Sequence, residues 1–333
     1  MILYPPIIAL LLGSFLVSMM LLYSASFAIK ILRSWDIKSG SELQLGLERK
    51  TYLISTIIGY AFGFQLISFF LFIYTADDLC VFFVGAMCAV GTLHVDPFGY
   101  PTLIMKILNF LLAGTWLIVN YTDNKAYDYP LIRKKYYLLL LITPFVLAET
   151  VLQLLYFLGL HPNIITSCCG SLFSAEAPGA AGGLIAFPSI PMKIVFYSGI
   201  AATLVSGAFF YRTARGGYFF SLLSALTFFI SIAALISFIS LYFYELPTHH
   251  CPFCILQKEY GYIGYVLYAL LLSGALSGIG TGALLLFRKE ASLVDIIPAI
   301  TCRLTLASVL AYAVFAAITT YQMIFSNFKL EGY

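Results

Sequence analysis

Residues 137–160 read YLLLLITPFVLAETVLQLLYFLGL, and Glu149 is the only charged side chain among them. A membrane-spanning helix needs about 20 mostly apolar residues. Because lipid offers the backbone no hydrogen-bond partners, such a run must satisfy its own N–H and C=O groups, as a helix does. The run also lacks the alternation of apolar and polar residues that is typical of a membrane β-strand. We therefore predict that it crosses a membrane as an α-helix.

Seven other stretches have the same character, and the composition of the whole chain agrees with them. Of 333 residues, 61% are hydrophobic and 10% are charged, whereas about 25% are charged in a soluble domain. This composition excludes a water-soluble globule, a disordered chain and a nucleic-acid-binding protein. We predict an all-α, polytopic integral membrane helical bundle of about eight transmembrane helices, a single domain over 1–333 that contacts the lipid bilayer. The other predicted helices cover 6–29, 51–74, 101–120, 193–211, 218–244, 260–287 and 304–325.

The basic residues fall in alternate connections between these helices. Lys and Arg favour the cytoplasmic side in short loops. Fourteen of the 18 Lys and Arg residues follow the first, third, fifth and seventh predicted helices. We therefore predict that these connections are cytoplasmic and that both termini are extracytoplasmic, in a plasma (inner) membrane.

The opposite connections, at 75–100, 161–192 and 245–259, collect the thiol and imidazole side chains. Ten of the eleven Cys and His residues lie there, and only Cys302 lies on the predicted cytoplasmic side. A thiolate attacks a disulfide sulfur directly, so cysteine pairs gathered on one face can pass electrons from one pair to the next. All six cysteines are therefore candidate catalytic residues. They come as one pair per loop: Cys80 and Cys88, Cys168 and Cys169, Cys251 and Cys254.

A recurring motif indicates possible internal duplication. Residues 101–107 (PTLIMKI) are similar to residues 188–194 (PSIPMKI), which lie 87 positions later. The first cysteines of successive pairs are 88 and 83 residues apart. Each repeat would be a two-helix hairpin with a cysteine-bearing outer loop, and duplications of this kind are common in membrane proteins.

Residues 250–258, HCPFCILQK, resemble a known redox motif. Cys251, Cys254, Gln257 and Lys258 match, position by position, the first redox motif of the DsbB family, Cys-x-x-Cys-x-x-(Glu/Gln)-(Arg/Lys). The spacing of the cysteine pair in loop 75–100 is similar to that of loop cysteines in relatives of vitamin K epoxide reductase. Both families have a smaller helical core than the one predicted here.

The resemblance implies a helical bundle that passes electrons from dithiols to a quinone. Cys251 and Cys254 would be the quinone-proximal pair, and Gln257 and Lys258 would contact the quinone. The expected function is a quinone-linked thiol–disulfide oxidoreductase that acts on an extracytoplasmic thiol protein. We also expect the motif at the N-terminus of the seventh helix, where the helix dipole and Lys258 would stabilise a thiolate. Cys251 would then meet the partner protein, and Cys254 would face the quinone.

Charged side chains also fall inside predicted helices. Glu149 lies near the middle of its apolar run, where an ionisable group is costly and marks a function by default. It is a candidate proton relay for quinone chemistry or a ligand for a transported ion. Alternatively it is a packing residue that bonds to Gln153 or Gln65. Lys106 and Lys193 lie a few residues inside their helices, and we expect them to extend to the outer lipid headgroups.

Two other roles for the outer cysteines stay open. Cysteine pairs in an oxidising compartment often become permanent disulfides, although a bond between the adjacent cysteines of loop 161–192 would be strained. Alternatively, His249 and His250 join Cys251 and Cys254 in binding copper or zinc. Either role would make the protein a permease or a non-catalytic subunit of a larger redox or metal-handling membrane complex. The sequence has neither a Cys-x-x-Cys-His motif for covalent haem nor a Gly-rich nucleotide-binding loop.

Overall fold

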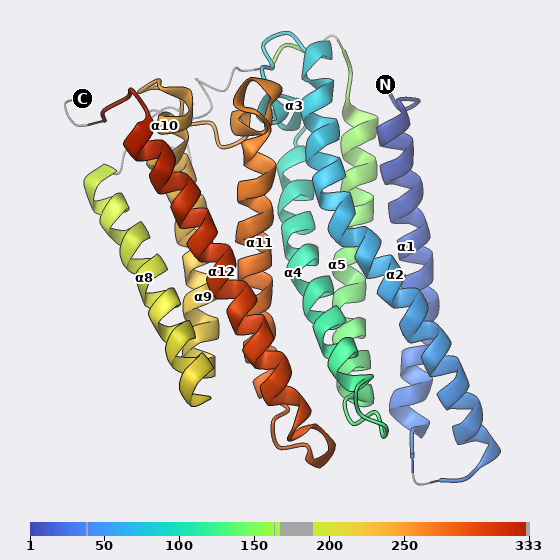
Figure 1. Ribbon diagram of the computed structural model, residues 1–333. Coiled ribbons are helices and arrows are strands. Elements are labelled where there is room, and N and C mark those ends of the chain that lie inside the picture. Colours follow the sequence, from blue (N-terminus) through green and yellow to red (C-terminus); the bar gives the residue numbers. More distant parts are fainter. Residues whose placement is uncertain (38, 163, 167–188, 331–333) are drawn as a thin grey trace. The chain divides into compact units, whose positions relative to one another are not determined.

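The structure is a computed structural model that describes residues 1–37, 39–162, 164–166 and 189–330. Apart from one isolated bridge between Val84 and Ile165, the regular secondary structure in these ranges is helical. Eight of the described helices are long and apolar enough to cross a membrane (Figure 1). The predicted all-α membrane bundle of about eight spanning helices is confirmed, and the protein is an integral membrane protein that contacts the lipid bilayer.

Each predicted span corresponds to one long helix, and most helices extend beyond the apolar run. The first four are α1 (Pro5–Ser34), α2 (Glu42–Asp78), α4 (Gly99–Asp123) and α5 (Ile132–Gly159). The other four are α8 (Ser189–Thr213), α9 (Gly217–Ala234), α11 (Ile263–Leu285) and α12 (Ile296–Phe325). Helix α9 continues through a π-helical turn, η2 (Leu235–Ile239), into α10 (Ser240–Tyr244).

The contacts group the chain into two compact units. The first comprises Met1–Thr75, Asp96–His161 and Leu286–Ile300, and so contains α1, most of α2, α4 and α5. Within it, α5 packs against both α1 and α4. The ring of Trp116 in α4 meets Phe62 of α2 edge-on, with 5.2 Å between centroids, and its Nε1 donates to Lys135 O at 3.0 Å. This buried indole therefore connects α2, α4 and α5.

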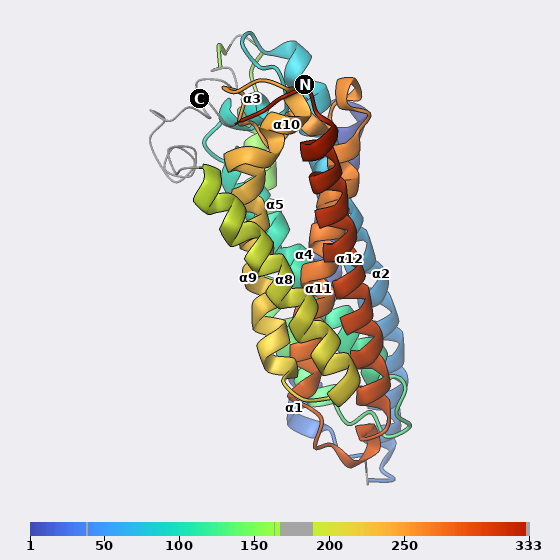
Figure 2. The same cartoon turned by 60° about the vertical axis from the view of Figure 1, so that its left-hand side comes forward.

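The second unit comprises Ala76–Val95, Pro162–Leu285 and Thr301–Tyr333. Its helix α9 packs against both α8 and α11, and Figure 2 shows α8 and α9 side by side. The contact between α9 and α11 is close, because a Cβ placed on Gly278 would lie 2.0 Å from Ser224 Oγ. Helix α12 joins them through Tyr312, whose hydroxyl donates to Ser224 O at 2.7 Å. Small residues thus allow these helices to approach closely.

Short elements of the second unit carry the cysteine-bearing connections. η1 (Leu79–Phe82) and α3 (Ala89–His94) follow α2, whereas η3 (Cys254–Leu256) and η4 (Lys258–Tyr260) precede α11. Thr166 adds a third segment, since its backbone N–H donates to Val84 O at 3.0 Å and its hydroxyl donates to Gly91 O at 3.1 Å. Residues of all three predicted outer loops therefore belong to one unit.

Candidate functional site

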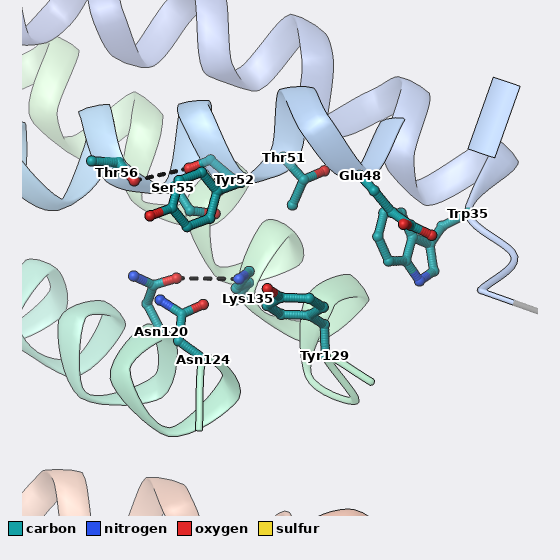
Figure 3. A pocket seen from close by; sticks show the side chains of 10 residues that line it. All are labelled: Trp35, Glu48, Thr51, Tyr52, Ser55, Thr56, Asn120, Asn124, Tyr129 and Lys135. Atoms are coloured by element: carbon teal, nitrogen blue, oxygen red, sulfur yellow. Dashed lines mark hydrogen bonds between the residues drawn. The ribbon is translucent and has the colours of Figure 1, made fainter. Parts of the chain in front are cut away.

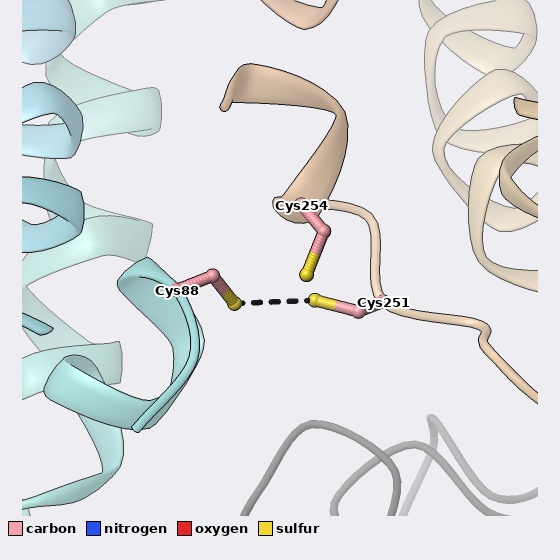
Figure 4. A group of neighbouring side chains, drawn as sticks. All are labelled: Cys88, Cys251 and Cys254. Atoms are coloured by element: carbon pink, nitrogen blue, oxygen red, sulfur yellow. Dashed lines mark hydrogen bonds between the residues drawn. The ribbon is translucent and has the colours of Figure 1, made fainter. Parts of the chain in front are cut away.

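Three cysteine sulfurs meet in the second unit and form what we name the sulfur cluster. The Sγ atoms of Cys88, Cys251 and Cys254 lie within 4.8 Å of one another, and those of Cys88 and Cys251 are 3.5 Å apart (Figure 4). Cys88 and Cys251 are fully buried, and Cys254 is 5% exposed. The Cys-x-x-Cys therefore has a third thiol beside it, contributed by a segment 163 residues earlier in the chain.

The other cysteines lie apart from the sulfur cluster or outside the described residues. Cys80 belongs to η1 and is half-buried. Cys302 lies in α12 and is also half-buried. Cys168 and Cys169 lie outside the described residues. Sequence reasoning grouped the cysteines by loop, and so it missed the convergence of Cys88 with the pair of loop 245–259.

Gln257 connects the two segments that carry the sulfur cluster. Its Nε2 donates to Met87 O at 2.7 Å and reaches Asp77 Oδ1 at 3.4 Å. The same Asp77 oxygen accepts the backbone N–H of Ala89 at 3.0 Å. Met87 immediately precedes Cys88 and Ala89 immediately follows it. The contacts therefore fix the backbone on either side of Cys88 and hold it near the Cys-x-x-Cys. The sequence marked Gln257 as a quinone contact, and it gave no signal for Asp77.

Two tyrosines fix the backbone of the Cys-x-x-Cys. The hydroxyl of Tyr244 donates to Cys251 O and accepts the backbone N–H of Ile255 at 2.9 Å. The hydroxyl of Tyr268 donates to Pro252 O. Both contacts hold the loop through main-chain groups. Neither tyrosine was singled out from the sequence, because an aromatic belt at the membrane interface predicts similar residues.

A hydrogen bond to the π-helical turn of the preceding helix holds the side chain of His250. The carbonyl oxygen of Ile236, within the π-helical turn η2, lies 3.0 Å from His250 Nδ1. Since a carbonyl only accepts, Nδ1 carries the proton. Burial lowers the pKa of His250, although the Ile236 carbonyl acts in the opposite sense. In the part of the chain that the structure describes, neither His249 nor His250 joins the sulfur cluster, so the mixed Cys–His metal site considered from the sequence does not assemble.

The Cys-x-x-Cys does not lie at the start of a membrane-spanning helix. Cys254 begins the three-residue η3, and α11 begins only at Ile263. Between them Gly261 and Tyr262 have φ values of +62° and +57°, a left-handed conformation that interrupts helical structure. The expected stabilisation of a thiolate by the dipole of the seventh helix is therefore wrong. Lys258 lies in η4 with an exposed side chain, and its contact with a quinone stays a prediction.

Glu149 lies at the centre of a cluster of buried polar side chains in the first unit. Its Oε1 accepts from Lys106 Nζ at 2.7 Å, and its Oε2 accepts from Gln65 Nε2 and Asn109 Nδ2, each at 2.5 Å. The side chains of Lys106 and Glu149 are both 1% exposed. The expectation that Lys106 extends to the lipid headgroups is therefore wrong, whereas the expected bond to Gln65 is confirmed. Gln153 bonds to α1 instead.

The partners of Glu149 indicate a charge-paired carboxylate. All three are N–H donors, and an ionised carboxylate only accepts hydrogen bonds. Lys106 Nζ also lies 5.3 Å from the centroid of the Phe72 ring, within the range of a cation–π contact. The sequence placed Glu149 inside a helix but missed its counter-ion, which lies 43 residues away. A role in proton transfer stays a prediction.

A second buried ion pair lies in the first unit beside a small pocket. Lys135 Nζ is 2.7 Å from Asp123 Oδ2, and their side chains are 1% and 0% exposed. Lys135 also donates to Asn120 Oδ1 at 3.1 Å, as Figure 3 shows. The pocket has a volume of about 50 Å³, and its lining includes Trp35 and Tyr129. Since one water needs about 10–15 Å³, the pocket has room for a few water molecules.

Comparison with protein-family models, curated proteins and solved structures found no match to this chain. A function for the protein therefore rests on its own residues and their geometry.

Proposed function

We propose that the protein is a membrane thiol–disulfide oxidoreductase in which Cys88, Cys251 and Cys254 exchange disulfide bonds. The observation that carries this proposal is the 3.5 Å distance between the Sγ atoms of Cys88 and Cys251, with Cys254 Sγ within 4.8 Å of both. Exchange proceeds by attack of a thiolate on a disulfide sulfur, so the attacking atom has to lie close to its target. A third sulfur adds nothing to a permanent disulfide, whereas an exchange reaction requires one.

The proposed step begins with a disulfide between Cys251 and Cys254. The thiolate of Cys88 attacks Cys251 Sγ, the Cys88–Cys251 bond forms, and the Cys251–Cys254 bond breaks. Cys254 then leaves as a thiolate. One disulfide replaces another, so this step neither gains nor loses electrons.

Net oxidation of a partner dithiol needs an acceptor for two electrons and two protons. We propose a membrane quinone, which would be reduced to the quinol while the protein disulfide is restored. The support for a quinone is the resemblance of residues 250–258 to the DsbB motif. Gln257 and Lys258 are its candidate contacts. Glu149 is a weaker candidate, because three side chains already occupy its carboxylate.

Exposure favours Cys80 as the cysteine that meets the partner protein. Cys251 is fully buried and Cys254 is nearly so, whereas Cys80 is half-buried. The assignment of Cys251 to the partner, made from the sequence, does not fit its burial. We therefore assign entry to Cys80, with transfer through Cys88 to the Cys-x-x-Cys.

We propose a plasma (inner) membrane location, and the distribution of basic residues supports an orientation with the cysteine-bearing segments and both termini on the extracytoplasmic side. That compartment is oxidising, so disulfides form and persist there. The partner would be an extracytoplasmic protein that carries a reduced dithiol.

The test measures quinone-dependent oxidation of reduced thioredoxin by the purified full-length protein in detergent. Cys251→Ala and Cys254→Ala should each lower the rate by at least about 100-fold, because each removes a reacting sulfur. Cys302→Ala is the control and should keep the original rate. Unchanged rates in both Cys-x-x-Cys variants would contradict the proposal and favour the non-catalytic membrane subunit.

A second measurement follows the exchange step itself. In the Cys254→Ala variant, mild oxidation should join Cys88 to Cys251, and mass spectrometry of the linked peptides identifies the bond. The oxidised unmodified protein should contain the Cys251–Cys254 bond instead. Failure to form the Cys88–Cys251 bond would remove Cys88 from the proposed pathway.

A further inference from the structure

The sulfur cluster has a second chemical use when all three of its thiols are reduced. We propose that the reduced cluster of Cys88, Cys251 and Cys254 binds one Cu(I) ion through three thiolates. The inference goes beyond disulfide exchange, because it concerns the reduced state and neither forms nor breaks a bond between sulfurs.

The spacing of the three sulfurs fits an ion placed between them. Metal–thiolate bonds of about 2.3 Å put sulfurs that share one ion roughly 3.8–4.0 Å apart. In the structure one pair is separated by 3.5 Å, and no pair is separated by more than 4.8 Å. Only small side-chain movements separate this arrangement from a three-coordinate site.

The donor set selects a soft ion of low coordination number. In the described part of the chain, three sulfurs converge, and no imidazole or carboxylate joins them. The hydroxyls of Tyr244 and Tyr268 and Nδ1 of His250 are bonded to main-chain groups. Thiolates favour Cu(I), zinc and iron–sulfur clusters. Structural zinc almost always takes four ligands, so three sulfurs favour Cu(I).

The surroundings hold the three sulfurs in place and exclude water. All three cysteines are buried. Gln257 ties the segment of Cys88 to the segment of the Cys-x-x-Cys, and Tyr244 fixes the backbone of Cys251. Cu(II) prefers nitrogen and oxygen ligands, and water is one of them. Because burial excludes water from the site, the site favours Cu(I) over Cu(II). Binding deprotonates the thiols, so the affinity should fall as the pH falls.

The first experiment titrates Cu(I) into the reduced full-length protein in detergent, under anaerobic conditions, against the chelator bathocuproine disulfonate. One Cu(I) per chain is expected. Cys88→Ser, Cys251→Ser and Cys254→Ser should each lower the affinity by at least about 100-fold, since each removes one of three ligands. Cys302→Ser is the matched control and should bind normally. Unchanged stoichiometry and affinity in the three cluster variants would overturn the proposal.

A second measurement needs no substitution and so does not depend on how the variants fold. Oxidation of the unmodified protein with diamide should abolish Cu(I) binding, because a disulfide removes two ligands, and reduction with a phosphine should restore it. Preferential binding of Zn(II) over Cu(I) would overturn the assignment of the ion. Disulfide exchange is measured separately with a metal chelator present. Loss of exchange with intact Cu(I) binding would then contradict only the proposed function, and the reverse result would contradict only the copper site.

Discussion

Gln257 Nε2 donates to the main-chain carbonyl oxygen of Met87 at 2.7 Å. Gln257 follows Cys254 by three positions, and Met87 immediately precedes Cys88. The contact therefore joins the two segments of the sulfur cluster without involving a sulfur atom. The side chain of Gln257 thereby makes a contact that positions Cys88. Gln257 is thus a positioning residue for the proposed exchange.

Replacing Gln257 with Leu keeps most of the side-chain volume and removes the hydrogen bonds. Formation of the Cys88–Cys251 disulfide should slow by about 5- to 10-fold, because a hydrogen bond of this kind contributes about 1 kcal/mol. The rate is measured in the Cys254→Ala background, with diamide as oxidant. Gln322→Leu is the matched control, since Gln322 Nε2 bonds another main-chain carbonyl of the second unit at 3.2 Å. Equal rates in the two variants would show that Gln257 does not position Cys88.

Replacing Lys106 with Met leaves Glu149 buried without its cation. Breaking a buried ion pair by removing one partner typically costs about 3–5 kcal/mol, so the free energy of unfolding should fall by that amount. The double variant with Glu149→Gln should recover much of the loss, because it leaves no uncompensated charge. Thermal unfolding of the purified protein in detergent measures both effects.

The control for Lys106 is an ion pair in the same unit that water reaches. Lys134 pairs with Glu290, and their side chains are 40% and 38% exposed. Lys134→Met should therefore cost less than about 1 kcal/mol. If Lys106→Met destabilises the protein no more than Lys134→Met does, the buried pair does not stabilise the first unit.

Replacing Gly278 with Ala should loosen the contact between α9 and α11. The new Cβ would lie 2.0 Å from Ser224 Oγ, and overpacking of this kind costs roughly 1–3 kcal/mol. Adding Ser224→Gly should recover part of the lost stability, because Ser224 Cβ, which would lie 2.4 Å from the new atom, is removed together with Oγ. Gly63→Ala is the control, because apart from its chain neighbours and the backbone of its own helix no atom lies within 4 Å of the added Cβ. A melting temperature of Gly278→Ala equal to that of the control would contradict the close packing.

A membrane-impermeant maleimide tests the predicted orientation. Cys80 and Cys302 are both half-buried, and the basic residues assign them to opposite sides of the membrane. After mild reduction of intact cells, the reagent should label Cys80 and spare Cys302, and permeabilised cells should label both. Labelling of Cys302 alone in intact cells would reverse the orientation.

The helices could be predicted from the sequence, because the length of an apolar run is a property of one segment. Their ends could not be predicted as well. Helix α12 begins at Ile296, before the predicted start at residue 304, since Arg303 interrupts the apolar run without ending the helix. Conversely, α11 starts after the predicted residue 260, because the backbone turns at Gly261 and Tyr262. The length of an apolar run predicts neither the continuation of α12 past Arg303 nor the turn before α11.

The contacts between side chains could be identified only from the three-dimensional structure. A motif of nine residues was enough to identify Cys251 and Cys254 as candidates. Cys88 was predicted as a catalytic cysteine, but its place beside Cys251 depends on a contact across 163 residues. Glu149 was conspicuous as a charge inside a helix, yet Lys106 was interpreted as a surface residue. A single sequence shows that a buried charge needs a partner, but it does not show which residue supplies it.

The two buried ion pairs of the first unit also bear on how the protein enters its membrane. Helix α4 carries Lys106 and Asp123, and α5 carries Lys135 and Glu149, so each helix contributes one charge of each sign. Among these four charges Glu149 lies near the middle of its helix, where an unpaired charge opposes insertion by about 2.5–3.5 kcal/mol. When α4 and α5 insert together as a hairpin, each charge on one helix pairs with an opposite charge on the other. We therefore expect α4 to remain at the translocon until α5 has been synthesised, so that the two partition into lipid together.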